Sequence, residues 1–188
     1  MNILMLQGGA RKTGNTAHVL ALVEAQLRKK GHQVSTIYLH GKNLNGCMGC
    51  LACKKKPDEI GCVQKDDVLP ILEEMLKSDA IVFASPLYFW GVNAQLKAVI
   101  DRMFSLYTGM GRPEHNSLLA GKKQALLMTG GGPQDNNAEL AFTAFARMTP
   151  YLKTTLAGEL FVGNCTKPEN MGPAVHEEVT RFVQTLEA

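Results

Sequence analysis

Residues 2–16 read NILMLQGGARKTGNT, and this stretch decides the fold. Its apolar run at residues 3–6 ends in Gly8 and Gly9, as a buried strand that closes in a glycine turn does. From Thr16 to Lys30 the apolar side chains fall on one helical face, and Gly31 follows as a stop signal. A strand, a glycine loop and an amphipathic helix in this order predict the first unit of a parallel α/β sheet.

The same alternation continues along the chain. Further strands are expected at residues 34–39, 80–84, 124–129 and 156–162, and further helices at 68–76, 93–104, 138–148 and 173–186. Asp66 and Asp67 precede the second helix and are expected to cap it. Strands and helices in alternation predict one domain over residues 1–188, with helices on both faces of a parallel sheet and a cysteine-rich insert at residues 41–65.

Composition narrows the class of protein. The chain has 188 residues, 45% of them hydrophobic, which excludes disorder. Its net charge of +3 is too mild to indicate nucleic-acid binding. The longest apolar stretch, residues 80–92, is shorter than the roughly 20 residues of a membrane-spanning helix, and no secretory signal is visible. We therefore expect a cytoplasmic protein with no membrane or nucleic-acid partner, whose cysteines are not structural disulfides.

The glycine loop, residues 8–16, is expected at the carboxyl edge of the sheet, where ligands of such folds bind. The start of the following helix offers free N–H groups and a partial positive charge to a phosphate. Asn15 stands where a Walker A motif needs lysine, and the Gly-x-Gly-x-x-Gly fingerprint is absent. The loop therefore suits a monophosphate held without magnesium, and the alternative is a tight turn with no ligand.

Two more loops are expected at the same edge. Residues 85–91 follow the third strand and contain three aromatic side chains, which either flank a planar heterocycle or pack beneath a helix. Residues 129–133 follow the fourth strand, and their three glycines let the backbone come close to a ligand. Three such loops at one edge indicate a binding site more strongly than any one of them.

These segments together resemble a known family. The ordered set is Gly8-Gly9-Ala10-Arg11-Lys12-x-Gly14-Asn15-Thr16, Cys47-x-Gly49-Cys50, Asp66-Asp67, Ser85-Pro86-x-Tyr88-Phe89-Trp90 and Lys97-x3-Asp101-Arg102. Over roughly residues 2–132 the chain resembles the flavodoxin-like NAD(P)H-dependent FMN reductases, and among them the iron–sulfur flavoprotein-like branch. The resemblance implies a five-stranded parallel sheet of order 2-1-3-4-5.

The resemblance also implies a function. FMN would take a hydride from NAD(P)H and pass electrons to flavin, quinone or another small-molecule or protein acceptor, in a homodimer or homotetramer. The residues implied to bind FMN are Gly9, Arg11, Thr13, Gly14, Asn15, Thr16, Pro86, Leu87, Tyr88, Phe89, Trp90, Gly91, Thr129, Gly130, Gly131 and Gly132. The family usually has Ser where Gly9 stands, so either Thr13 compensates or FMN binds more weakly.

The cysteine run Cys47-x2-Cys50-x2-Cys53-x8-Cys62 is the most unusual local feature. Thiolates at this spacing suit a [4Fe–4S] cluster, and the resemblance implies one. The lysines at 54–56 would offset its negative charge. Bound zinc and free thiols are the alternatives. The main rival function is therefore an iron–sulfur flavoprotein electron carrier that does not turn over NAD(P)H, and a thiol redox sensor is a third.

Three minor expectations complete the analysis. Asp101 and Arg102 are interpreted as a structural pair. Cys165 is interpreted as a small apolar filler. Residues 106–121 contain Pro113 and little periodicity, and they either lie over the flavin of a neighbouring subunit or form a surface loop.

Overall fold

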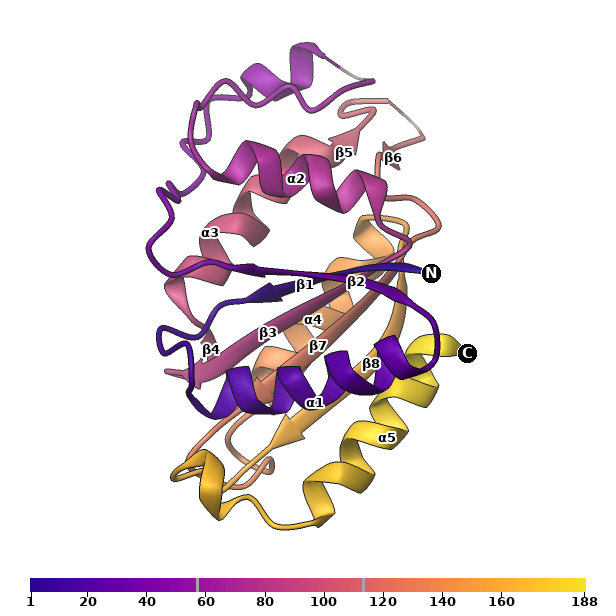
Figure 1. Cartoon of the computed structure of the whole chain (residues 1–188). Helices are drawn as coiled ribbons and strands as arrows, with labels where there is room; N and C mark the ends of the chain where they lie inside the picture. The colour runs from indigo at the N-terminus through magenta and orange to yellow at the C-terminus, as the bar shows by residue number, and fades with distance from the viewer. Residues whose placement is uncertain (57, 113) are drawn as a thin grey trace.

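A twisted parallel sheet forms the centre of the computed structural model, which describes residues 1–56, 58–112 and 114–188. Within these residues the parallel strands are β1 (Asn2–Gln7), β2 (Gln33–Tyr38), β3 (Ala80–Tyr88), β7 (Lys123–Thr129) and β8 (Thr155–Val162). They lie in the order β2-β1-β3-β7-β8, as Figure 1 shows. The predicted order 2-1-3-4-5 is confirmed.

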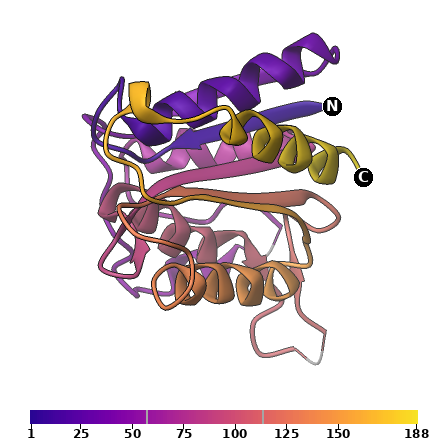
Figure 2. The ribbon, with the colours of Figure 1, turned by 90° about the horizontal axis from the view of Figure 1, so that it is seen from below.

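Helices cover both faces of the sheet (Figure 2). The helices α1 (Asn15–Lys29) and α5 (Ala174–Glu187) pack on one face, over the alternate β1 residues Ile3 and Met5. The helices α2 (Val68–Lys77), α3 (Ala94–Arg102) and α4 (Glu139–Tyr151) pack on the other, over Leu4 and Leu6. Both sides of β1 and β3 are thus buried, which explains their continuous apolar sequences.

The third strand is longer than predicted, so the expectation of a loop at residues 85–91 was wrong. β3 continues to Tyr88, turns, and pairs antiparallel with β4 (Gly91–Val92). The carbonyl of Ala84 accepts the N–H of Gly8, just after β1. Backbone groups two residues apart on a strand point to the same side, so the nitrogen of Pro86 also faces the β1 side of β3. The chain of β1 has already turned away there, and Pro86 loses no ladder hydrogen bond.

The cysteine-rich insert contains one short 3-10 helix, η1 (Ala52–Lys55), among its described residues. Figure 1 shows it at the end of the molecule beyond α2, next to the hairpin of β5 (Tyr107–Thr108) and β6 (Asn116–Ser117). The 3-10 helix η2 (Met103–Leu106) leads from α3 into that hairpin, and η3 (Pro168–Asn170) precedes α5. Pro57 of the cysteine spacer and Pro113 of residues 106–121 lie outside the described residues.

Of the two aspartates predicted to cap α2, only Asp66 accepts an N–H from the start of the helix. Asp67 stands at the N-cap position but makes no capping hydrogen bond, and its Oδ2 accepts the N–H of Asn43 at 2.8 Å instead. Asp66 Oδ1 accepts the N–H of Val68 at 3.2 Å. The side chain of Asp66 is only 2% exposed, and it also pairs with a buried arginine, described below.

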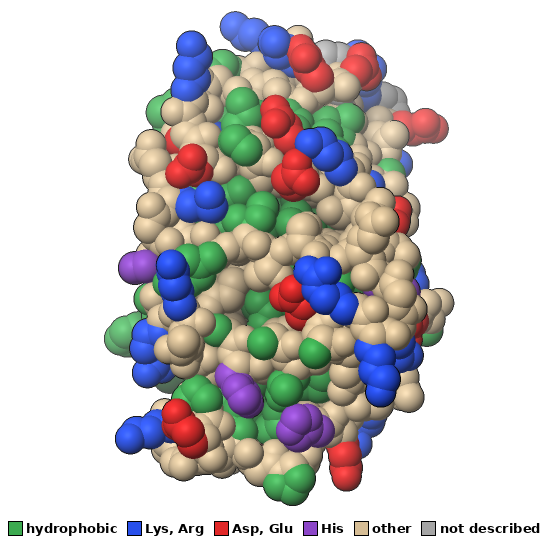
Figure 3. All heavy atoms as spheres, in the orientation of Figure 1, with side chains coloured by type: hydrophobic (Ala, Val, Ile, Leu, Met, Phe, Trp, Pro, Cys, Tyr) green, Lys and Arg blue, Asp and Glu red, His purple; other side chains and the backbone are tan. Residues whose placement is uncertain are grey.

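The surface is mixed in charge. In Figure 3, basic and acidic side chains are interspersed on the visible face and do not gather in one patch. Within the described residues, no helix is long and apolar enough to cross a membrane.

Candidate functional site

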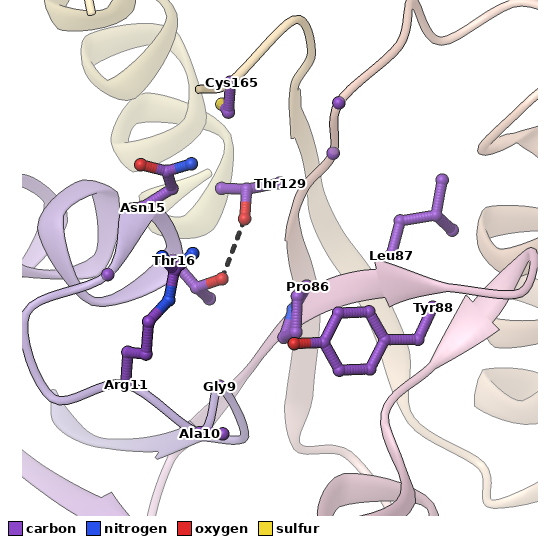
Figure 4. Close-up of a pocket in the computed structure, with 13 residues that line it drawn as sticks. Gly9, Ala10, Arg11, Asn15, Thr16, Pro86, Leu87, Tyr88, Thr129 and Cys165 are labelled. Atoms are coloured by element: carbon purple, nitrogen blue, oxygen red, sulfur yellow. Dashed lines mark hydrogen bonds between the residues drawn. The ribbon is translucent and has the colours of Figure 1, made fainter. Parts of the chain in front are cut away.

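A pocket opens at the carboxyl edge of the sheet, where the loops after β1 and β7 meet the end of β3 (Figure 4). It encloses about 540 Å³ of space, counted out to its open mouth. Its lining residues are Gly9, Ala10, Arg11, Gly14, Asn15, Thr16, Pro86, Leu87, Tyr88, Thr129, Gly130, Gly131 and Cys165. In an open sheet of this order, the crevice beside β1 and β3 is the switch point at which ligands bind.

The glycine loop forms one wall of the pocket. Gly8 must lack a side chain, because a Cβ there would lie 2.4 Å from Asn93 Oδ1. Gly14 is extended, with φ −84° and ψ 177°, and α1 begins at the buried Asn15. No side chain of the described residues caps this helix start. Its first N–H groups therefore remain available to an anion, as a phosphate site requires.

Two buried hydroxyls meet across the pocket. Thr16 Oγ1 from α1 and Thr129 Oγ1 from β7 form a hydrogen bond of 2.7 Å, in which either can donate, as the dashed line in Figure 4 shows. Beside them, Asn15 Oδ1 is buried and lacks a hydrogen-bond partner among the described residues. A buried polar atom without a partner is costly. These groups indicate a polar ligand that would complete the hydrogen bonding.

The β3–β4 hairpin forms the opposite wall. The pocket surface includes Pro86, Leu87 and Tyr88 from the end of β3. The turn itself holds Phe89 and Trp90 at φ of 46° and 61°, the left-handed region that side chains of this size rarely adopt. Phe89 is 95% exposed.

A buried network beneath the pocket joins these two walls. The side-chain amide of Asn93 donates to the carbonyl of Gly8 at 2.6 Å, and the backbone N–H of Asn93 donates to Ser85 Oγ at 2.9 Å. Asn93 is 2% exposed and stands at the N-cap position before α3, so one residue ties the glycine loop to the end of β3. Sequence analysis missed Asn93, because nothing local distinguishes it from an ordinary helix cap.

The pocket contains most of the residues predicted to bind FMN, but not all of them. Thr13 is exposed and is not among the described lining residues. The residues Phe89, Trp90, Gly91 and Gly132 are likewise not among the described lining residues.

Cys165 packs against the core beneath α1 and α5, as predicted for an apolar filler, and it is also part of the pocket wall, which was not predicted. It is half-buried in the loop after β8, and its thiol donates to the carbonyl of Val162 at 3.1 Å. Burial raises the pKa of this thiol above its ordinary value. Figure 4 shows Cys165 next to Asn15 and Thr129.

A second, smaller cavity lies in the insert, away from this pocket. Its lining includes Cys47, Cys50, Cys53 and Cys62, together with Arg102 at the end of α3 and residues of η2. We call it the thiol pocket. The thiols are unpaired in the structure. Within the described residues, no group of three or more His, Cys, Asp or Glu side chains is arranged to hold a single metal ion.

Arg102 enters the thiol pocket from α3, and the prediction that it pairs with Asp101 was wrong. Asp101 is exposed and pairs with Lys97, one helical turn earlier, at 2.7 Å. Arg102 is 2% exposed and forms a two-pronged ion pair with Asp66, at 2.8 and 3.2 Å. Adjacent positions on a helix point in different directions, so two neighbouring charges meet different partners.

The ion pair of Arg102 and Asp66 holds both charges in a buried place. Burial alone would raise the pKa of Asp66, but hydrogen bonds from Arg102 and from the N–H of Asn45 outweigh it, so the pKa lies below its ordinary value. Burial disfavours the charge of Arg102, and hydrogen bonds to Asp66 and Cys62 more than compensate, so the pKa of Arg102 is raised. Both groups are therefore ionised near neutral pH.

Lys54 fixes η1 to the rest of the chain. Its Nζ donates to the carbonyl of Tyr107 at 2.6 Å and to that of Phe104. It also lies 3.8 Å from the centre of the Phe104 ring, a cation–π contact. Burial lowers the pKa of Lys54, and the nearby Cys53 and Cys47 oppose that shift. A second positive charge thus stands close to the thiols.

The fold and the first pocket define a class. A parallel sheet in this strand order, with a glycine loop and an open helix start at its switch point, is flavodoxin-like. A family model described as NADPH-dependent FMN reductase matches residues 1–184. The chain belongs to that family.

Individual relatives agree with this assignment. An iron-sulfur flavoprotein of Archaeoglobus fulgidus is 32% identical over 130 residues, which cover 61% of this chain and 58% of the relative. An iron-sulfur flavoprotein of Methanocaldococcus jannaschii is 38% identical over 109 residues, covering 58% of this chain and 55% of the relative. The chain thus spans little more than half the length of these curated relatives.

A solved structure shows the same fold over the whole chain. The NAD(P)H:quinone oxidoreductase from Methanothermobacter marburgensis superimposes with a TM-score of 0.69 at 17% identity, covering 98% of this chain and 96% of that one. At this identity the likeness concerns the fold.

Proposed function

We propose that this chain is an FMN-dependent oxidoreductase that takes a hydride from NADH or NADPH and passes electrons to flavin, a quinone or another acceptor. One observation carries the proposal: an open helix start, a buried hydroxyl pair and a wall from β3 and β7 share one pocket at the switch point. Family membership supports the same conclusion.

The residues present fit FMN. A phosphate needs hydrogen-bond donors, and the first turn of α1 supplies N–H groups, the hydroxyl of Thr16 and the side chain of Asn15. Arg11 adds a positive charge at the rim. The unpartnered Oδ1 of Asn15 needs a donor, and FMN has hydroxyl and N–H groups to give. Pro86–Tyr88 and Thr129–Gly131 would surround the flavin ring.

In this proposal the protein positions reactants and the cofactor does the redox chemistry. When bound, FMN would supply the hydride-accepting and electron-transfer chemistry. Pro86–Tyr88 of β3 and the glycines at 130 and 131 line the pocket and would contact the flavin ring. The buried network around Asn93 fixes the two walls relative to one another before any ligand enters.

The proposal is tested by FMN titration of cofactor-free protein, followed by NADH and NADPH oxidation with a quinone. Asn15→Ala should weaken FMN binding by about tenfold or more, because it removes hydrogen bonds to the phosphate. The matched control, Asn170→Ala, lies outside the pocket wall as described and should bind FMN normally. Equal affinity of both variants would mean that the phosphate binds elsewhere.

The thiol pocket favours a second candidate, an iron–sulfur flavoprotein electron carrier. Its four cysteines line one cavity, and two cations stand near them, Arg102 at Cys62 and Lys54 at Cys53 and Cys47. Four thiolates with compensating positive charge are the donor set of a [4Fe–4S] cluster, which binds them on separate irons and so spreads them more widely than one ion does. Cys47, Cys50, Cys53 and Cys62 would hold it.

Iron analysis and turnover separate the two candidates. Anaerobic reconstitution should give about four irons per chain if the cluster forms, and no bound iron would refute it. An electron carrier should be reduced quickly by ferredoxin but should not oxidise NADPH in the presence of quinone. Steady NADPH oxidation favours the reductase.

Assembly and partners belong to the same proposal. We infer a homodimer or homotetramer that uses a small-molecule or protein acceptor, with residues 1–188 acting as one FMN-binding domain. β5 and β6 pair antiparallel within the segment 106–121, and either placement predicted for this segment remains a hypothesis. Sedimentation at micromolar concentration tests the assembly, and a monomer there would contradict it.

A further inference from the structure

Arg102 makes more contacts than an ion pair requires. Its Nη1 and Nη2 reach the carboxylate of Asp66, Nη1 also donates to the carbonyl of Asn45 at 3.0 Å, and Nε donates to Cys62 Sγ at 3.2 Å. Its side chain is 1% exposed, so water competes for none of these bonds. Each bond has a charged donor and is therefore among the stronger kinds.

The three partners of Arg102 come from opposite ends of the insert. Asn45 lies where the chain leaves the body of the protein, and Cys62 and Asp66 lie where it returns. Asp66 Oδ2 also accepts the N–H of Asn45 at 3.1 Å, so the two ends are tied directly as well. Figure 1 shows α3 running from β4 toward the insert, which brings Arg102 to this meeting point.

We propose that Arg102 is the positioning residue of the thiol pocket: it closes the base of the insert and fixes Cys62 in the pocket wall. Neutralising Asp66 needs only a positive charge. The hydrogen bond to sulfur and the bond to Asn45 need a planar group with donors in several directions, which arginine has and lysine lacks. The simpler alternative is a core ion pair with no bearing on the thiols.

The role proposed for Arg102 rests on the proposed cluster site for one measurement only, the reduction potential of a bound cluster. If a cluster binds, the N–H that Arg102 gives to Cys62 sulfur raises its reduction potential, because such bonds stabilise the more negative, reduced state. The contacts of Arg102 with Asn45, Cys62 and Asp66 exist without a cluster, so their effect on the insert can be measured in the protein as isolated.

The test compares wild type with three full-length variants by hydrogen exchange and mass spectrometry. Arg102→Lys keeps the charge opposite Asp66 but cannot bridge all three partners. Lys97→Met removes an exposed charge from the same helix and is the matched control. Cys62→Ser leaves an oxygen that can accept the bond from Nε, so its insert should stay ordered.

For Arg102→Lys, exchange of residues 44–66 should be about tenfold faster or more, while β3 and β7 exchange as in wild type. Lys97→Met and Cys62→Ser should match wild type throughout. Where iron is bound, Arg102→Lys should also lower the cluster's reduction potential.

Two results would overturn the inference. Unchanged exchange of residues 44–66 in Arg102→Lys would show that Arg102 does not order the insert. Faster exchange across β3 and β7 as well would show an ordinary core residue. If wild type binds no iron, the proposed cluster is refuted. The role of Arg102 is not, because the exchange experiment tests that role in protein without a cluster.

Discussion

Replacing the two hydroxyls that meet across the FMN pocket separates binding from folding. Thr16 Oγ1 and Thr129 Oγ1 form a buried hydrogen bond of 2.7 Å, and the two residues are 5% and 4% exposed. Valine has nearly the shape of threonine but no hydroxyl. We therefore consider Thr16→Val, Thr129→Val and the double variant.

The magnitudes follow from the burial of the pair. Each single variant leaves one buried hydroxyl without its partner, which costs about 1–3 kcal/mol. The double variant removes both polar groups together, so its loss of stability should be smaller than the sum of the single losses. Its FMN affinity should fall furthest, because the bond lost from Thr16 to the phosphate is worth about 1.5–3 kcal/mol, or roughly tenfold to a hundredfold in Kd, and the bond lost from Thr129 to the ring is worth about 0.5–1.5 kcal/mol more.

Two assays are needed. Urea unfolding of the cofactor-free proteins gives the free energies of unfolding, and quenching of FMN fluorescence gives Kd. We expect the double variant to lose less free energy of unfolding than the sum of the two single losses. We also expect it to bind FMN at least about a hundredfold more weakly than wild type. A double variant that binds FMN as tightly as wild type would refute the assignment of this pocket to FMN.

Three further predictions concern single positions. Gly9→Ser should tighten FMN binding by up to about tenfold, because the serine hydroxyl adds a hydrogen-bond donor. The side chain has room, since a Cβ at this position would make only ordinary contacts, the nearest at 3.5 Å. A higher Kd for FMN than in wild type would contradict this prediction. Asp66 has a lowered pKa when folded, so its buried ion pair stabilises the protein above about pH 3.9 and is lost as pH falls below that value. The stability difference between wild type and Asp66→Asn should therefore shrink in acid, and a constant difference from pH 6 to pH 3 would count against the pair. Saturating FMN should slow alkylation of Cys165, mapped by mass spectrometry, but not that of the exposed Cys47; equal rates with and without FMN would place Cys165 outside the site.

The sheet and the glycine loop could be predicted because their signals are local. The apolar run at residues 3–6, the glycines after it and the uninterrupted period of α1 each constrain a few neighbouring residues. Because parallel strands end at one edge, the same signals also placed Thr16 and Thr129 together, although they are far apart in the sequence. The strand at Ser85–Tyr88 was missed because proline normally ends a strand, and only the path of the neighbouring strand shows why it does not here.

The partners of Arg102 and the place of Cys165 could not be predicted in this way. Arg102 lies among the apolar positions of α3, but nothing near it points to Asp66 or Cys62, which are brought there by the path of the insert. Cys165 reaches the pocket because the chain after β8 bends back, with the N–H of Cys165 donating to the carbonyl of Gly130 at 2.9 Å. Contacts between distant loops depend on tertiary geometry, which no local pattern encodes.

The most direct test of the central claim is a visible absorption spectrum of anaerobic protein, loaded with FMN, before and after addition of NADPH or NADH. The account predicts flavin bands that remain with the protein through gel filtration and bleach on addition of the reduced nicotinamide. A protein that stays colourless because it retains no added FMN would contradict it.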